Sequence, residues 1–126
     1  MAKQWTTEQL NSFSQADDMH VSPFYDDGKT YGTPTWIWSV VVDNNLYVRA
    51  YNGQNSRWYQ SAMKQKAGKI RLAGKEFETE YIDAAGNVEL DQKINAAYKE
   101  KYQNSPYLPP MLEKGPVSAT VKLSPK

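Results

Sequence analysis

The chain has 126 residues, of which 40% are hydrophobic and 13% aromatic, a composition that favours one folded globular domain over a disordered chain. It contains no cysteine, so disulfides, thiolate metal sites and cysteine nucleophiles are excluded. The net charge of +1 argues against nucleic acid as the main partner. No stretch has the length and hydropathy of a signal peptide or a membrane span, so we expect a cytoplasmic protein.

Residues 1–17 predict a short N-terminal helical segment. Thr6 fits the N-cap position and Gln9 the third helical position, which together make a capping box. Residues 19–82 then predict the strands of a barrel, interrupted by a helix at 56–66.

The strongest strand signal is TWIWSVVV at 35–42. One of its faces carries the large apolar side chains Trp36, Trp38, Val40 and Val42. Asp43–Asn45 is a hairpin turn signal, and LYVRAY at 46–51 returns as the partner strand. That strand has an apolar face of Leu46, Val48 and Ala50 and a polar face of Tyr47, Arg49 and Tyr51.

Two further strands are expected around Gly74, followed by a helix at 89–103 and a closing strand at 117–123. Six short strands, mostly connected by hairpins, and two or three helices predict a mainly β protein of the α+β class. The expected architecture is a six-stranded antiparallel split β-barrel with helices packed at its side, in a single domain over 1–126.

The charges are unevenly distributed. Residues 45–75 carry seven basic side chains and no acid, whereas residues 76–91 carry six acids and no base. The segment NGQNSRW at 52–58 lies in the basic block, where a strand ends and a helix begins. Helix N-termini bind phosphates readily, so Ser56, Arg57 and, from the preceding strand, Arg49 are candidate ligands for an anion, beside the plain interpretation of an N-cap and a surface arginine.

Other kinds of site find no support in the sequence. His20 is the one histidine and has no triad partner in view. The paired aspartates at 17–18 and 26–27 do not have metal-ligand spacing, so no metal site is expected, and no glycine-rich phosphate loop is present. Catalytic residues cannot be assigned from these patterns.

The order of these features resembles the FMN-binding split-barrel superfamily. TPTWIWSVVVDNNLYVRAYNG, a helix opening with Ser-Arg, and KIRLAGKEFETEYI follow that superfamily's order of hairpin, short helix, two strands, second helix and closing strand. The superfamily includes pyridoxamine-phosphate-oxidase-like, flavin-reductase-like and deazaflavin-dependent nitroreductase-like branches. The likeness covers about 19–123. The combination of TWIW, LYVRAY, RWY and AAYKEKY also resembles an uncharacterised bacterial branch, a domain of unknown function.

The resemblance implies a cofactor site made of five residues. Its Ser-Arg pair falls on Ser56 and Arg57, which would hold the flavin phosphate. The polar end of the second hairpin strand falls on Arg49 and Tyr51. Trp58 continues the helix start, at a position where oxidase relatives often carry a second basic residue.

The function that the resemblance implies is binding of FMN or a deazaflavin, with oxidoreductase chemistry supplied by the cofactor. It also implies a homodimer with the ligand groove between its subunits. Heme, or no cofactor at all, stays open, because basic positions of the oxidase relatives are not matched here. One alternative is a split-barrel module that binds a small ligand or a protein without a cofactor. Single-stranded nucleic acid is a weaker alternative, which the near-neutral charge disfavours.

Overall fold

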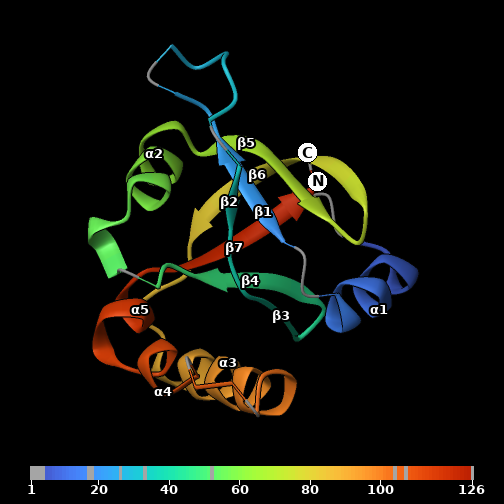
Figure 1. Ribbon diagram of the computed structural model, residues 1–126, viewed down its shortest axis with the longest axis vertical. Helices are drawn as coiled ribbons and strands as arrows, with labels where there is room; N and C mark the ends of the chain where they lie inside the picture. Colours follow the sequence, from blue (N-terminus) through green and yellow to red (C-terminus); the bar gives the residue numbers. More distant parts are fainter. Residues whose placement is uncertain are drawn as a thin grey trace.

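The computed structural model describes residues 5–16, 19–25, 27–32, 34–51, 53–103, 105–106 and 108–125 (Figure 1). Residues 1–4 and 17 of the expected N-terminal segment, and Asn52 of the candidate anion site, lie outside the described residues. The helices are α1 (Thr7–Gln15), α2 (Arg57–Gln65), α3 (Val88–Lys101), α4 (Leu108–Met111) and α5 (Lys114–Ser118), with a 3-10 turn, η1, at Gly53–Asn55. The strands are β1 (His20–Pro23), β2 (Thr35–Trp36), β3 (Ser39–Val42), β4 (Asn45–Arg49), β5 (Ala67–Leu72), β6 (Lys75–Asp83) and β7 (Thr120–Pro125).

The strands form one antiparallel sheet in the order β2-β1-β5-β6-β7-β4-β3. The sheet curls into a half-barrel, and the helices pack around it (Figure 1). These observations confirm the mainly β, α+β class and the antiparallel, barrel-like architecture expected from the sequence.

The segment 35–42 forms two short strands where one was expected, which raises the count among the described residues from six strands to seven. Its first part, β2, pairs with β1, whereas its second part, β3, pairs with β4, at the opposite end of the strand order. One straight strand cannot follow both edges of a curled sheet. The chain therefore leaves the ladder at Ile37 and Trp38, and the Ile37 N–H donates to the Met19 carbonyl at 3.0 Å.

The larger hydrophobic core lies inside the curled sheet. The face of β4 predicted to be apolar, Leu46, Val48 and Ala50, is buried there, which confirms the alternation inferred from the sequence. Two helices at separate places on the sheet add side chains to this core (Figure 1). Helix α1 contributes Leu10 and Phe13, and helix α2 contributes Trp58, Tyr59 and Ala62.

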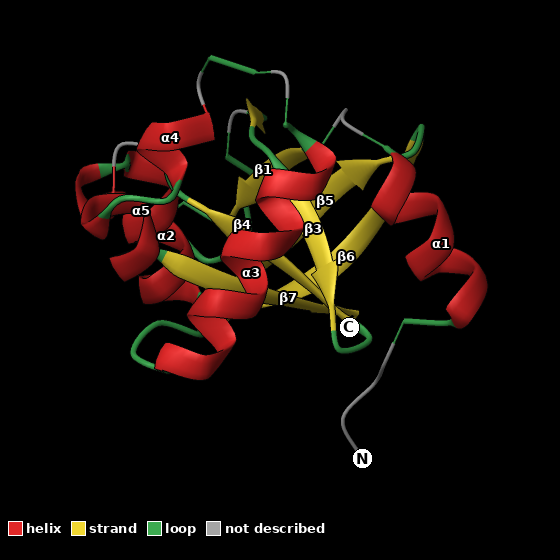
Figure 2. Cartoon of the chain, turned by 90° about the horizontal axis from the view of Figure 1, so that it is seen from below, coloured by secondary structure: helices red, strands yellow, loops and turns green. Residues whose placement is uncertain are grey.

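A second core lies between the sheet and α3, which crosses β3 and β4 on their outer face (Figure 2). The sheet side contributes Val40, Val42 and Tyr47 from the strands and Trp38 from the link before β3, and the helix contributes Ile94 and Tyr98. The Tyr98 hydroxyl donates to the Trp38 carbonyl at 3.0 Å. The face of 35–42 predicted to carry large apolar side chains is thus the face that receives α3, with Trp36, 56% exposed, outside the contact.

The helix boundaries differ from expectation by one or two residues for α2 and α3. Within the described part of the N-terminal segment, α1 begins at Thr7, directly after the predicted capping box, and ends at Gln15. In that box the Gln9 N–H donates to Thr6 Oγ1 at 3.1 Å, and the Thr6 N–H donates to Gln9 Oε1 at 2.9 Å.

The closing strand expected at 117–123 begins later, at Thr120. The residues before it form α5, in which Pro116 occupies the first turn, where a missing N–H breaks no helical hydrogen bond. The Val117 N–H donates to the Glu113 carbonyl at 3.1 Å. Because residues 114–118 form this short helix, the chain rejoins the sheet only at Thr120.

Two hairpins turn on residues with positive φ. Asp43 (φ 51°) and Asn44 (φ 65°) join β3 to β4, which confirms the predicted turn. Ala73 (φ 55°) and Gly74 (φ 75°) join β5 to β6. Two-residue hairpin turns of this hand match the twist of the strands, and Asn, Asp and Gly are the residues that tolerate them.

Candidate functional site

The chain turns sharply between the end of β4 and the start of α2. Gly53 has a φ of +68°, and a Cβ added to it would lie 3.2 Å from the Gly115 carbonyl oxygen, so this position requires glycine. The Gly53 N–H donates to the Ala50 carbonyl at 2.8 Å, and the Ser56 N–H donates to the Gly53 carbonyl at 3.1 Å. These two bonds fix where α2 begins.

Ser56 and Arg57 lie next to each other at this helix start. Ser56 is the N-cap residue, largely buried, yet its hydroxyl makes no capping hydrogen bond. Arg57 is exposed, and the first turn contains no acidic residue. The first N–H groups of a helix have no acceptor within the helix and carry the positive end of its dipole. The site therefore combines a hydroxyl, a guanidinium and backbone donors.

Trp58 and Tyr59, the next two residues of α2, are turned into the protein. They are 8% and 7% exposed and belong to the core inside the sheet. Burial raises the pKa of Tyr59, and the negative charge of Asp83 adds to the effect. The indole of Trp58 thus anchors the helix start in the core.

The structure places the two residues expected from the preceding strand in different surroundings. Tyr51, just before the turn, is 47% exposed. Arg49 is fully buried, at 0% exposure. Its guanidinium donates through Nη1 to Asn95 Oδ1 at 2.5 Å, through Nη2 to the Asp91 carbonyl at 3.2 Å, and through Nε to Thr120 Oγ1 at 3.4 Å.

Arg49 therefore joins β4 to α3 and β7. Asp91 and Asn95 lie four residues apart on one face of α3, and Thr120 faces Arg49 in the pairing of β4 with β7. The guanidinium carbon lies 5.5 Å from the centre of the Tyr98 ring. Burial lowers the pKa of Arg49, and burial raises the pKa of Tyr98.

Of the five residues proposed for a cofactor, Ser56, Arg57 and Trp58 are consecutive at the start of α2; of these three, Arg57 is exposed, whereas Ser56 and Trp58 are largely buried. The alternation of β4 correctly put Arg49 on the strand's second face. That face is covered by α3, so the hydrogen bonds of Arg49 described above are made with the helix and with β7. The four-residue spacing of Asp91 and Asn95 puts them on one face of a helix, but it does not say which strand that face covers.

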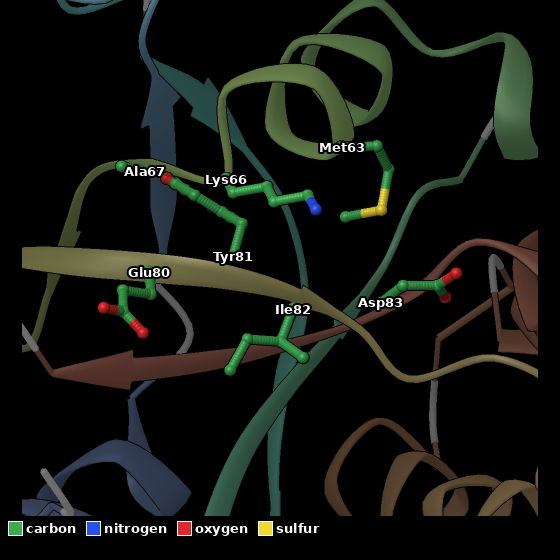
Figure 3. A pocket seen from close by; sticks show the side chains of 7 residues that line it. All are labelled: Met63, Lys66, Ala67, Glu80, Tyr81, Ile82 and Asp83. Atoms are coloured by element: carbon green, nitrogen blue, oxygen red, sulfur yellow. The ribbon is translucent and has the colours of Figure 1, made fainter. Parts of the chain in front are cut away.

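A hollow of about 500 Å³ at the other end of α2 was not anticipated from the sequence (Figure 3). It is lined by Met63, Lys66, Ala67, Glu80, Tyr81, Ile82 and Asp83. Here a part of the basic block, at Lys66, meets the acidic block, because the hairpin turn at Ala73 and Gly74 sets Ala67 opposite Glu80. Counting residues in both directions from that turn predicts which residues of the two strands lie opposite each other, and this register is the sequence signal for the charges that meet at the hollow.

The nucleic-acid alternative would stack bases on the aromatic side chains between 47 and 59, beside Arg49, Arg57 and Arg71, and most of these side chains are not available for it. Tyr47, Trp58, Tyr59 and Arg49 are buried. Tyr51, Arg57 and Arg71 are exposed but lie on different elements. The structure thus removes most of the surface on which that alternative depended.

In the described part of the chain, no three potential metal-ligating side chains of His, Cys, Asp or Glu come together. The helices of the described residues all fall short of the length and hydrophobicity that a bilayer span requires.

A family model described as an uncharacterized protein conserved in bacteria, DUF2255, matches residues 9–123. This match confirms the resemblance to an uncharacterised bacterial branch. Membership of the FMN-binding split-barrel superfamily stays a prediction. No curated protein and no solved structure matches the chain.

Proposed function

The chain belongs to the bacterial DUF2255 family, and from this premise we propose that it binds a phosphate-bearing flavin, FMN or a deazaflavin, at the start of α2. Ser56 and Arg57 contact the phosphate in this proposal. The cofactor, once bound, supplies hydride transfer, so that the protein acts as an oxidoreductase.

The observation that carries this proposal is the unused donor set at the start of α2. The Ser56 hydroxyl makes no cap, and the first turn has no carboxylate to oppose an anion. Arg57 is exposed beside it. A phosphate placed here would accept hydrogen bonds from the hydroxyl and from backbone N–H groups, and a charge-assisted pair of bonds from the guanidinium.

The remaining residues of the predicted site take supporting roles. Trp58, held in the core, fixes the helix start against the sheet. Tyr51 offers an exposed aromatic ring beside the turn that leads into α2, suited to contact with the flavin ring. Arg49 takes no direct part, because its guanidinium bonds to α3 and β7.

The test compares FMN with riboflavin, which lacks the phosphate, and with a phosphate-bearing deazaflavin. Purified protein is titrated while flavin fluorescence and the melting temperature are followed. We expect FMN or the deazaflavin to be quenched on binding and to raise the melting temperature, and riboflavin to bind at least about tenfold more weakly, because a charge-assisted bond is worth roughly 1.5–3 kcal/mol.

Matched arginine variants locate the site. Arg57→Met should weaken FMN binding by about tenfold or more, whereas Arg71→Met, which removes an exposed arginine from β5, should leave it unchanged. If neither flavin is quenched nor shifts the melting temperature, the proposal fails. Equal loss in both variants would show that only general charge attraction is involved.

A second candidate is a binding module without a cofactor. It is favoured by the burial of Trp38 and Trp58, whose rings pack in the two cores and are not available to a cofactor ring. Absence of any flavin response, together with a preserved fold, supports this candidate over the first.

We also propose that the protein is a homodimer with the flavin groove at the interface between subunits. Exposed aromatic side chains, Trp36 at 56% and Tyr51 at 47%, supply apolar contact area of the kind that interfaces favour. Sedimentation equilibrium should give twice the monomer mass. A monomer at all concentrations would contradict the proposed dimer but would leave the proposed phosphate site unaffected.

A further inference from the structure

We propose that the hollow between the end of α2 and the end of β6 binds a free amino acid with an apolar side chain, in its zwitterionic form. The hollow of about 500 Å³ falls within the roughly 300–1,000 Å³ typical of small-molecule sites. It lies at the opposite end of α2 from the flavin site. A nine-residue helix spans about 14 Å, so the two sites are separate and can be tested independently.

The first argument is that opposite charges line one hollow without neutralising each other. Lys66 comes from the end of α2, and Glu80 and Asp83 come from β6. The ion pairs found among the described residues join Lys69 to Glu76 and Lys93 to Asp43, and neither involves these three groups. A zwitterion is the small ligand that satisfies a separated ammonium and carboxylate at once.

Hydrogen bonds fix the backbone from which these charged side chains extend. Lys66 has a φ of 58°, its N–H donates to the Ala62 carbonyl at 2.8 Å, and its carbonyl accepts from the Tyr81 N–H at 3.0 Å. Asp83 Oδ1 accepts from the Ala85 N–H at 3.0 Å, which orients the carboxylate and leaves its second oxygen for a ligand. Both groups therefore start from fixed backbone positions, which reduces the entropy lost on binding.

The second argument is the apolar surface between the charges. Met63 is partly buried against the core and lines the hollow, whereas Ile82, 40% exposed, points to the other side of β6. Figure 3 shows Lys66 and Met63 extending toward one another beneath α2, with Asp83 at the far end of the hollow. In the proposed complex the Lys66 ammonium donates to the ligand carboxylate, Asp83 accepts from its ammonium, and the apolar side chain packs on Met63.

The test uses the methyl groups of methionine as probes in protein labelled with [methyl-¹³C]methionine. Met63 lines the hollow, whereas Met19 is fully buried in the core and reports on the fold. Titration with L-leucine should shift the Met63 signal in a saturable way and leave Met19 in place. Leucine amide, without a carboxylate, and N-acetyl-leucine, without an ammonium, should each bind at least about tenfold more weakly.

Charge variants assign each end of the ligand. Lys66→Gln should remove the preference for leucine over leucine amide, and Asp83→Asn should remove the preference over N-acetyl-leucine. Lys64→Gln, on the same helix, and Glu89→Gln, at the start of α3, lie outside the hollow and should bind as wild type does. No saturable shift at Met63, equal binding of leucine and its blocked forms, or unchanged preferences in Lys66→Gln would each overturn the proposal. An unshifted Met19 signal in every variant shows that the fold is retained.

Discussion

The side chain of Arg49 carries a positive charge into the interface between the sheet and α3. Its hydrogen-bond partners come from three kinds of acceptor: the amide of Asn95, the backbone carbonyl of Asp91 and the hydroxyl of Thr120. One carboxylate oxygen, Asp91 Oδ1, is buried and has no hydrogen-bond partner among the described residues. A buried cation surrounded by such groups makes the position of α3 specific, because any shift of the helix would leave a charge without acceptors.

Arg49→Met should therefore lower the free energy of unfolding by about 2–4 kcal/mol, since the acceptors stay buried after the guanidinium is gone. Urea unfolding followed by fluorescence measures the change. Arg71→Met, at an exposed position, should change stability by less than about 0.5 kcal/mol. Should Arg49→Met be too unstable to purify, Asn95→Ala removes one acceptor alone and should cost about 1.5–3 kcal/mol. A change in the free energy of unfolding near zero for both variants would show that the hydrogen bonds of Arg49 do not stabilise the position of α3.

Ala73 adopts a left-handed backbone, φ 55°, in the turn between β5 and β6. A left-handed residue with a Cβ costs roughly 1–2 kcal/mol, and asparagine tolerates this conformation better than alanine. Ala73→Asn creates an Asn-Gly turn and should raise the free energy of unfolding by about 0.5–1 kcal/mol. Ala96→Asn, exposed on α3, should instead lower it by about 0.5 kcal/mol, because asparagine is a poor helix former. A loss of stability in Ala73→Asn would contradict the argument.

At the scale of single elements, the local patterns in the sequence were sufficient for most boundaries. The alternation in β4 predicted which of its side chains enter the core, and the Thr6–Gln9 box predicted the start of α1. Ser56 and Arg57 were placed correctly at a helix start for the same reason, since an N-cap depends on neighbours a few residues away. Whether they hold a flavin stays a prediction.

Contacts between elements distant in the sequence were not accessible in this way. Arg49 meets Asn95, which lies 46 residues further along the chain, only because α3 docks on the outer face of β4. The sequence predicted a helix at 89–103, but not which face of which strand it covers. The splitting of 35–42 has the same origin, because it depends on how strongly the whole sheet curls.

The capping box of α1 is an element whose contribution can be measured directly. Thr6→Ala removes the acceptor for the Gln9 N–H and should lower the free energy of unfolding by about 1 kcal/mol. Thr7→Ala, one residue further on, removes an exposed threonine from the helix and should be neutral or slightly stabilising. Equal effects of the two substitutions in urea unfolding would show that the cap is not what stabilises the start of α1.

For the molecule as a whole, buried tyrosines make the free energy of unfolding depend on pH in the alkaline range. Burial raises the pKa of both Tyr81 and Tyr98 above the ordinary value of 10.0. A raised pKa in the folded state means that the full stability is present below about pH 10, where the unfolded tyrosines are also protonated. Above that pH the unfolded chain loses protons that the folded chain keeps, so stability falls.

We therefore expect the free energy of unfolding to drop by about 1.4 kcal/mol per pH unit for each of the two tyrosines above pH 10. Urea unfolding between pH 8 and 11 measures the slope. Tyr98→Phe should lower stability at pH 8, because the Trp38 carbonyl loses its donor, but should also make the slope shallower. Tyr51→Phe removes an exposed phenol and should leave the slope as in the wild type. A flat profile up to pH 11 would contradict the linkage.

The segment 35–42 supplies both edge strands of the sheet, one of two residues and one of four. Short edges offer little template for a strand from another molecule, so we expect the native protein not to polymerise through its sheet. Because one segment forms both edge strands, the two edges are lost together when it detaches. Local unfolding of these eight residues would expose the hydrogen-bonding edges of β1 and β4 at the same time, and each could then pair with a strand from another molecule.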